Sequence, residues 1–469
     1  MKNRILTTLS FLLLTLLVQA QIKVASILGD NMVLQRNSEV KIWGTSGAKD
    51  KLIISASWDK SKITATSNEK GEWLAKIKTT EAGGPYIITI SNAKQKVEVK
   101  NVLLGEVWLC SGQSNMEMPM MGYISSPVNG ANEALFNADN NNIRLFTVKP
   151  TTTNTTQNNC EGNWLVANSE SASQFSAVGY FFARRLQQKL KVPVGMICAS
   201  SGGSRIESWM SKEDISKFPE ALLSSSKDDQ DNRKPSQLFN GMIHPIQNYV
   251  IKGALWYQGE NNRINYQHYA ALMGGLVEGW RNNFGIGQFP FYFVQIAPNA
   301  YDNSKDILSP KLWDEQLKAS LAIPNCGMVS TVDLGEEDDI HPAEKEIISK
   351  RLSYWAISET YGIKGIEYKN TYFKKAVAKD DTMIVSFENN VHGITSFGKE
   401  VTNFEIAGED RIFYPAKAVF KTSKVVKVSA PEVKKPVAVR YCYHNFPQGK
   451  GFLYNTAGLP ILPFRSDNW

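Results

Sequence analysis

Hydrophobic and polar residues follow three successive patterns along the chain. From residue 22 to 104 they alternate with a period of two between turn signals, as in Glu39–Trp43 and Tyr86–Ile90. From about residue 105, short continuous apolar runs alternate with segments whose apolar residues recur at helical spacing. From about residue 365 the strand-like alternation returns. A period of two indicates half-buried strands, whereas the middle pattern indicates buried parallel strands connected by helices.

These patterns predict an α/β protein of three domains that follow the first 20 residues. We expect an N-terminal β-sandwich-like domain over residues 21–104. Residues 105–364 are expected to form an α/β domain whose parallel sheet is covered by helices on both faces. A second β-sandwich-like region is expected over residues 365–469.

The middle region contains the elements of the expected parallel sheet. The strands are expected in the apolar runs 107–110, 194–199, 251–256, 291–296 and 328–332. The helices are expected at 178–190, 266–280, 312–321 and 343–355. The stretch 120–165 is rich in Asn and Thr, so we expect it to be a long loop or insertion.

The first 20 residues have the features of a secretory signal peptide. Lys2 and Arg4 precede a mostly apolar run from Ile5 to Val18, and Ala20 ends a pattern that approximates a cleavage site. The run is short for a membrane-spanning helix. We therefore expect a secreted or periplasmic protein that keeps no membrane span after cleavage.

Charge and cysteine content exclude several other classes. The net charge of +7 is spread along the chain without a basic block, so it gives no case for nucleic-acid binding. The five cysteines are scattered and odd in number. They form neither a disulfide framework nor a CxxC metal site.

The segment from Gly105 to Met118 is the most informative part of the sequence. A buried strand runs there into Ser-Gly-Gln-Ser-Asn, which ends at Asn115. Ligands in open α/β sheets bind beyond the carboxyl ends of the strands, and Ser114 stands at such an end. Gly112 permits a tight turn, and a helix that starts after the serine would direct free backbone N–H groups at a developing oxyanion. Serine is also a favoured helix cap, so the motif alone leaves that alternative open.

A second segment, Asp-Asp-Ile-His-Pro, follows the last expected strand. A serine hydroxyl needs a base to accept its proton, and the imidazole of His341 suits that task near neutral pH. The imidazole in turn needs a carboxylate to orient it; Asp338, three residues earlier, can fold back to it, and Asp339 is a close competitor. A solvated histidine in an acidic loop is the alternative. Among the other four histidines, His244 is the main rival, but no aspartate accompanies it.

The loop after the expected strand 194–199 is rich in glycine. Gly203 could donate its backbone N–H to an oxyanion, although an ordinary glycine turn has the same sequence. Arg205 could meet a carboxylate of a substrate, or it could serve in a surface ion pair.

The loop after the expected strand 251–256 carries two further candidates. Gln258 could be a side-chain donor to the oxyanion, and Glu260 could organise its neighbours. Asn115, beside the serine, is a further candidate for oxyanion or substrate contacts. A polar loop with a solvated glutamate is the alternative interpretation.

Four motifs together resemble a known family. They are Gly-Gln-Ser-Asn-Met at 112–116, Gly-Gly-Ser-x-Ile-Glu-Ser-Trp at 202–209, Trp-Tyr-Gln-Gly-Glu-Asn-Asn at 256–262 and Asp-Ile-His-Pro at 339–342. In this order they are similar to the sialate O-acetylesterase family of SGNH hydrolases, over about residues 22–469. The resemblance implies a three-layer α/β/α hydrolase domain, no metal or other cofactor, and acetyl esters of sugars as substrates.

The resemblance also implies roles for individual residues. Ser114 would be the nucleophile and His341 the base, while Gly203 and Gln258 would help to form the oxyanion hole. Asp338 and Asp339 both remain candidates for the acid partner. In place of the Gly-x-Asn of other SGNH enzymes, this chain has Gln-Gly-Glu, so its third oxyanion donor is inferred.

We therefore predict a secreted serine esterase that removes O-acetyl groups from carbohydrates, with acetylated sialic acid as the first candidate substrate. The alternatives are an esterase of acetylated xylan or another plant glycan, and a non-enzymatic glycan-binding protein of the cell surface. A glycosidase is less favoured, because adjacent aspartates do not flank a bond as that chemistry requires.

Overall fold

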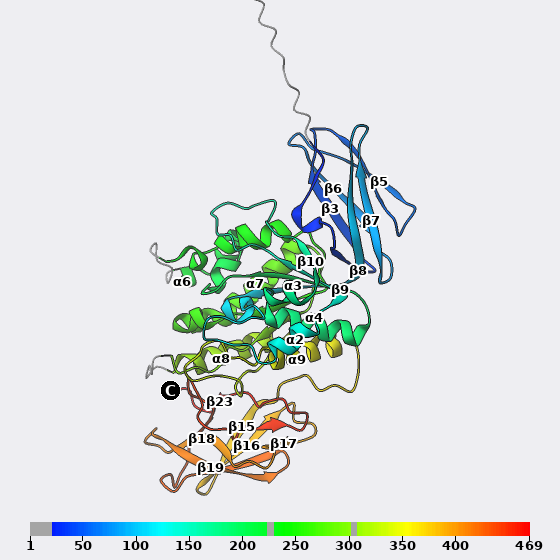
Figure 1. Cartoon of the computed structure of the whole chain (residues 1–469). Helices are drawn as coiled ribbons and strands as arrows, with labels where there is room; N and C mark the ends of the chain where they lie inside the picture. The colour runs from blue at the N-terminus through cyan, green and yellow to red at the C-terminus, as the bar shows by residue number, and fades with distance from the viewer. Residues whose placement is uncertain (1–20, 223–228, 302–306) are drawn as a thin grey trace, which may run out of the picture.

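The computed structural model describes residues 21–222, 229–301 and 307–469. The expected signal peptide, residues 1–20, lies outside the described residues. Figure 1 shows three parts in succession: a β-rich part at the N-terminal end, a central α/β part, and a second β-rich part that is coloured yellow to red.

The N-terminal part consists of two sets of strands that share one hydrophobic core. A three-stranded antiparallel sheet contains β1 (Lys23–Val24), β3 (Glu39–Thr45) and β6 (Glu72–Lys78). The other set contains β2 (Val33–Gln35), β4 (Lys51–Ala56), β5 (Lys62–Thr66) and β7 (Gly83–Ser91). Alternate residues are buried in β4 and β6, which is the period of two that the sequence indicates.

Strand β8 (Lys96–Gly112) connects this part with the central sheet. Its first half pairs with β7, and its second half pairs with two parallel strands of the centre. The expected boundary between residues 104 and 105 therefore falls inside one continuous strand. At this point Gly105 passes very close to a neighbouring chain segment, since a Cβ on it would lie 2.1 Å from the carbonyl oxygen of Pro193.

The central sheet has the strand order β10-β9-β11-β8-β12-β13-β14, and all its neighbours are parallel except the edge pair β10 and β9. Besides β8, the expected strands are β11 (Val194–Ser200), β12 (Gly253–Tyr257), β13 (Phe291–Val294) and β14 (Cys326–Val329).

The interpretation of residues 120–165 as a loop or insertion is wrong in part. This stretch contains α2 (Ala131–Phe136), β9 (Asn140–Thr147) and the first half of β10 (Trp164–Ala167). Strand β9 begins with three asparagines, and its buried residues, Ile143–Phe146, include Arg144. A continuous apolar run was therefore absent from the sequence, although β9 lies inside the sheet.

Helices cover both faces of the central sheet (Figure 1). Helices α4 (Ala177–Leu190) and α9 (Lys345–Trp355) pack together on one face, while α7 (Tyr269–Phe284) and α8 (Leu308–Ala322) pack together on the other. The buried β8 serves both layers, because successive side chains of a strand point to opposite faces. The central part is therefore a three-layer α/β/α structure.

The helices differ from the expectation in their boundaries. The helix expected at 266–280 begins only at Tyr269, after the 3-10 turns of η6 (Glu260–His268). The short helices are α1 (Ser114–Glu117), α3 (Ser169–Ser173), α5 (Lys212–Ile215) and α6 (Pro219–Leu222). The short 3-10 and π turns are η1 (Ser26–Leu28), η2 (Ile206–Trp209), η3 (Asp231–Arg233), η4 (Phe239–Ile243), η5 (His244–Ile246) and η7 (Ala356–Thr360).

The C-terminal part is built on one antiparallel sheet of seven strands and a separate two-stranded ribbon. The sheet contains, in spatial order, β15 (Tyr372–Lys379), β16 (Thr382–Glu388), β20 (Val425–Ser429), β19 (Phe413–Thr422), β18 (Val401–Ala407), β21 (Ala438–Tyr441) and β23 (Phe464–Arg465). The ribbon pairs β17 (Ile394–Thr395) with β22 (Tyr454–Asn455).

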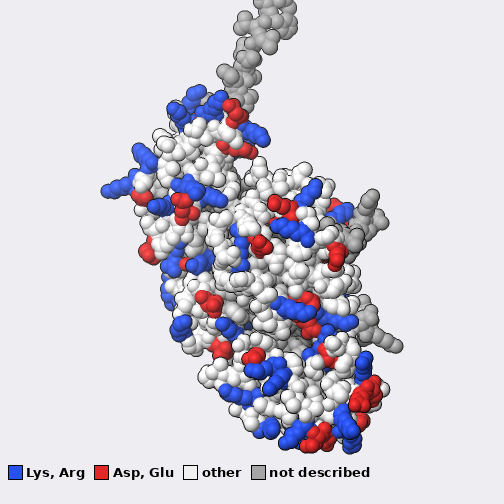
Figure 2. Space-filling model, turned by 180° about the vertical axis from the view of Figure 1, so that it is seen from behind, with Lys and Arg blue, Asp and Glu red and all other residues white. Residues whose placement is uncertain are grey.

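Three further properties bear on the class of protein. The described helices include none with the length and apolarity needed to cross a membrane. All five cysteines are free thiols, and only Cys326 is not fully buried. On the face that Figure 2 shows, basic and acidic side chains are interspersed.

Candidate active site

The loop that carries Ser114 is fixed between the ends of β8 and β12. Gly112 has φ +137°, and a Cβ on it would lie 2.1 Å from the carbonyl oxygen of Tyr257. Only glycine fits this close approach. The next residue, Gln113, donates its backbone N–H to the same carbonyl oxygen over 2.9 Å, and its side-chain oxygen accepts the N–H of Gly259. These contacts hold the serine at the carboxyl edge of the sheet, at the start of the single turn α1.

His341 lies within hydrogen-bonding distance of this serine. The distance from its Nε2 to Ser114 Oγ is 2.9 Å, although the two residues are 227 positions apart in the chain. The histidine belongs to the loop between β14 and α9, which reaches the same edge of the sheet. Tyr123 packs its ring edge against the imidazole, with ring centroids 5.2 Å apart, and its hydroxyl donates to the Ser114 carbonyl oxygen over 3.2 Å. The geometry brings together a hydroxyl and an imidazole, the two groups that a serine nucleophile and its base require.

Asp339, rather than Asp338, contacts the histidine. Asp339 Oδ1 lies 3.5 Å from His341 Nδ1 and accepts the backbone N–H of the same residue over 2.8 Å. Asp338 is exposed to solvent. The suggestion that Asp338 folds back to the ring is therefore wrong, because a carboxylate two residues before the histidine already occupies that position.

The surroundings of His341 favour its neutral form. Partial burial lowers its pKa, the ammonium of Lys345 lowers it further, and Asp339 acts in the opposite direction. Only a neutral imidazole can accept the proton of a serine hydroxyl. The direction of this pKa shift is the one that a general base requires at neutral pH.

Two backbone N–H groups are available for an oxyanion next to the serine. The loop after β11 brings Gly202 so close that a Cβ on it would lie 3.5 Å from Ser114 Cβ. Gly202 donates its own N–H to Glu117 Oε2 over 2.6 Å. Gly203, with φ +70°, and Ser114 donate their backbone N–H groups to no described residue. Free donors that face an incoming carbonyl oxygen are what an oxyanion hole requires.

Gln258 is not available as an oxyanion donor. Its side chain is fully buried, and its amide nitrogen donates to the Ser204 carbonyl oxygen over 3.0 Å and to Asn262 Oδ1 over 2.8 Å. Its side-chain oxygen accepts the hydroxyl of Tyr269. Since a primary amide has two N–H donors, both are used within the protein. The predicted role of Gln258 is wrong; the residue holds the two loops that flank the site.

Asn115 does not face a substrate either. It is buried, and its amide nitrogen donates to Glu260 Oε1 over 2.7 Å and to the Ile340 carbonyl oxygen over 3.0 Å. Its side-chain oxygen accepts Lys345 Nζ over 2.6 Å. Asn115, which directly follows Ser114, is therefore bonded to Ile340, which directly precedes His341, and the prediction of direct substrate contact is wrong.

Arg205 is engaged in an ion pair. Its Nη1 lies 3.1 Å from Asp229 Oδ2, and the two side chains are 11% and 14% exposed. Of the two interpretations left open by the sequence, this supports the ion pair over contact with a substrate carboxylate.

Three polar residues of this region, Asn261, Lys345 and Arg233, were not predicted from the sequence. Asn261 places its amide nitrogen 3.7 Å from the position of a Cβ on Gly203. Lys345 stands four residues after His341, but its burial could not be deduced from the sequence. Arg233 comes from a polar segment that has no motif. Of these, Asn261 alone lay inside a recognised motif, one residue after Glu260.

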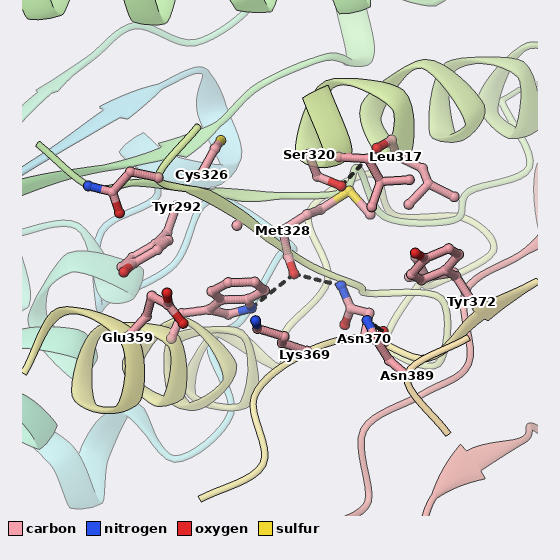
Figure 3. Close-up of a pocket in the computed structure, with 15 residues that line it drawn as sticks. Tyr292, Leu317, Ser320, Cys326, Met328, Glu359, Lys369, Asn370, Tyr372 and Asn389 are labelled. Carbon is pink, nitrogen blue, oxygen red and sulfur yellow. Dashed lines mark hydrogen bonds between the residues drawn. The ribbon is translucent and has the colours of Figure 1, made fainter. Parts of the chain in front are cut away.

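A cavity of about 290 Å³ lies elsewhere, at the junction of the central sheet with the C-terminal part (Figure 3). The carbonyl oxygen of Met328 accepts the indole N–H of Trp355 over 3.1 Å and the amide N–H of Asn370 over 2.6 Å at its wall. Its lining does not include Ser114 or His341. Among the described residues, no group of three or more His, Cys, Asp or Glu side chains is arranged to hold a metal ion.

Comparison with known proteins assigns a family to this site. The sequence model of the family "Carbohydrate esterase, sialic acid-specific acetylesterase" matches residues 104–349, which is more than half of the chain and includes both Ser114 and His341. The chain belongs to this family.

Individual relatives agree with the family match. The chain is 30% identical to the sialate O-acetylesterase of Homo sapiens, over 74% of this chain and 72% of the human protein. It is 28% identical to the rat enzyme, over 94% of this chain and 93% of that protein. A carbohydrate acetylesterase from Xanthomonas citri has a similar structure, with a TM-score of 0.87, 31% sequence identity, and coverage of 96% of this chain and 100% of that chain. The protein is therefore a carbohydrate esterase, and the alternative of a non-enzymatic glycan-binding protein is wrong.

Proposed function

We propose that this esterase removes O-acetyl groups from sugars through an acetyl-serine intermediate. The observation that carries the proposal is the 2.9 Å distance between Ser114 Oγ and His341 Nε2 beside two free backbone N–H groups. Ser114 Oγ attacks the acetyl carbonyl carbon while His341 Nε2 accepts the hydroxyl proton. Asp339 orients the imidazole and stabilises its charged form.

The developing oxyanion is held by the N–H groups of Ser114 and Gly203. We assign the third donor to the side chain of Asn261, because its amide nitrogen lies beside Gly203 and makes no hydrogen bond with another described residue. Such donors stabilise the charge that appears only in the transition state.

The attack first forms a tetrahedral intermediate, which collapses with release of the sugar hydroxyl. His341 returns its proton to the departing sugar oxygen, which leaves the acetyl group on Ser114. A water molecule then attacks the acetyl carbonyl with His341 again as the base, and acetate leaves. The serine regains its proton at the end of the cycle.

The proposed substrate is O-acetylated sialic acid, and the proposed location is outside the cytoplasm. The names of the curated relatives support the substrate, and the features of residues 1–20 in the sequence support export. Esters of acetylated xylan or another plant glycan are the second candidate, because the Xanthomonas citri relative is named as a carbohydrate acetylesterase without a defined sugar.

A comparison of defined substrates tests this function. We expect acetate release from 9-O-acetyl-N-acetylneuraminic acid with a higher kcat/KM than from acetylated xylo-oligosaccharides, and loss of both activities in Ser114→Ala. A preference for the xylo-oligosaccharides would contradict the sialate assignment, and unchanged turnover by Ser114→Ala would contradict the mechanism.

A further inference from the structure

Three side-chain nitrogens surround one point beside the oxyanion loop. Around the position that a Cβ on Gly203 would occupy, Asn261 Nδ2 lies at 3.7 Å, Arg233 Nη2 at 3.8 Å and Asn232 Nδ2 at 3.9 Å. They come from two separate segments of the chain, η3 and η6. All three side chains are partly accessible to solvent. Because each nitrogen is a donor, the arrangement suits a negatively charged or strongly accepting group.

The guanidinium of Arg233 is held in place at this point. Its Nε donates to the carbonyl oxygen of Gly203 over 3.2 Å. The neighbouring Asn232 donates to the carbonyl oxygen of Gly202 over 2.6 Å, which attaches the whole turn η3 to the glycine loop. A side chain fixed in this way loses little conformational entropy when it binds a ligand.

The positive charge of Arg233 has no carboxylate partner among the described residues. Arg205, by contrast, is paired with Asp229, and Lys234 is paired with Asp231. The Nη groups of Arg233 also donate no hydrogen bond to a described residue. An arginine fork is well matched to a carboxylate, which it can bind through two parallel hydrogen bonds.

This arginine lies close to the nucleophile. Gly203, which contacts Arg233, directly follows Gly202, and a Cβ on Gly202 would lie 3.5 Å from Ser114 Cβ. The guanidinium and the serine hydroxyl therefore flank the same two-residue turn. Arg233 is therefore a candidate to contact the part of a substrate that lies beyond the ester.

We propose that Arg233 binds the carboxylate of the sugar, so that this esterase selects acetylated acidic sugars over neutral ones. The inference rests on the proposed function and assigns to one residue the recognition of monosaccharides that carry both an O-acetyl ester and a carboxylate, such as sialic or uronic acids. It replaces Arg205 with Arg233 as the residue that recognises an anionic substrate.

The test compares two substrates that differ only in the carboxylate. Acetate release is measured for O-acetyl-N-acetylneuraminic acid and for its methyl ester, with the wild-type protein, Arg233→Gln and Arg233→Lys. We expect Arg233→Gln to lower kcat/KM for the free acid by about 10- to 100-fold, mainly through KM, as for the loss of a charge-assisted hydrogen bond. Turnover of the methyl ester should change by less than about threefold. Arg233→Lys keeps the positive charge but not the guanidinium fork. Its kcat/KM for the free acid should therefore lie between the values of the wild-type protein and Arg233→Gln.

Lys234→Gln is the matched control, because it removes one positive charge from the adjacent position, where the side chain is paired with Asp231. This variant should leave the ratio of kcat/KM for the free acid to kcat/KM for the methyl ester unchanged. A second measurement is independent of any variant: KM of the wild-type protein for the free acid should rise with salt, and KM for the methyl ester should not.

Three results would overturn the proposal. The wild-type protein could show no preference between the free acid and the methyl ester, or Arg233→Gln could leave the preference intact. Alternatively, Arg233→Gln could lower kcat/KM for both substrates equally, which would indicate that Arg233 only supports the conformation of Gly203. Hydrolysis of p-nitrophenyl acetate separates these results from failure of the proposed function. If that reaction requires Ser114 while the preference for the free acid is absent, the esterase mechanism stands and only the carboxylate site is lost.

Discussion

Lys345 and Asn115 meet in the interior of the protein, where the lysine Nζ donates to the asparagine Oδ1 over 2.6 Å. Burial lowers the pKa of Lys345 to about 7, even though Glu260, Asp339 and Glu336 act to raise it. The same ammonium lowers the pKa of His341. A buried lysine thus contacts the residue after Ser114 through a hydrogen bond and acts on His341 through its charge.

The pH dependence of the activity should reflect this lysine. Activity requires neutral His341, so kcat/KM should rise with pH through the pKa of His341, which lies below its usual 6.5. In Lys345→Met a positive neighbour is removed, and the midpoint of the acid limb should move to higher pH. Lys350→Met, on the exposed side of the same helix, is the control and should keep the wild-type midpoint. An unchanged midpoint in Lys345→Met would show that its charge does not act on His341.

Substitution of Asp339 should lower kcat far more than substitution of the adjacent Asp338. Asp339→Asn removes the carboxylate beside His341 Nδ1, and we expect kcat to fall by up to about 10⁴-fold, as when the orienting aspartate of a serine hydrolase is lost. Asp338→Asn alters an exposed side chain and should stay within about twofold of wild type. The measurement is kcat for p-nitrophenyl acetate, with circular dichroism to verify folding. The reverse order of the two variants would contradict the assignment of Asp339.

Substitution of Asn261 should lower the catalytic rate, whereas substitution of Gln258 should lower the stability of the protein. Asn261→Ala should lower kcat by about 10²- to 10³-fold, the usual cost of one lost oxyanion donor, with little change in Tm. Gln258→Ala leaves buried polar partners without hydrogen bonds, so we expect it to lower the free energy of unfolding by about 1–3 kcal/mol. Thermal unfolding and steady-state kinetics of both variants provide the check. A stable Gln258→Ala with a selective loss of kcat would restore Gln258 as the oxyanion donor.

Much of the central fold could be predicted because its strands are buried on both faces. Such strands appear as continuous apolar runs, and β11 (Val194–Ser200) and β13 (Phe291–Val294) were found in this way. Strand β9 was missed, since its first residues are asparagines and its position inside the sheet depends on pairing with β11. Pairing between distant segments leaves no periodic signal in one sequence.

The site was predicted less completely than the fold, and for a different reason. The motifs contain Ser114 and His341, and their order along parallel strands indicates that they meet at one edge. Which amide or carboxylate of a motif faces the substrate depends on hydrogen bonds with other loops. Gln258 and Asn261 are three residues apart in one motif. Only the hydrogen bonds from Gln258 to Ser204 and Asn262 reveal that both N–H donors of the Gln258 amide are used within the protein.

Covalent labelling of the nucleophile tests the central claim most directly. The protein is treated with a fluorophosphonate at neutral pH, and intact mass and peptide mapping by mass spectrometry follow. We predict one adduct per chain, located on Ser114, that is absent from Ser114→Ala and forms much more slowly in His341→Ala. No adduct in the folded wild-type protein, or an adduct on a different residue, would contradict the proposal that Ser114 and His341 form the catalytic pair.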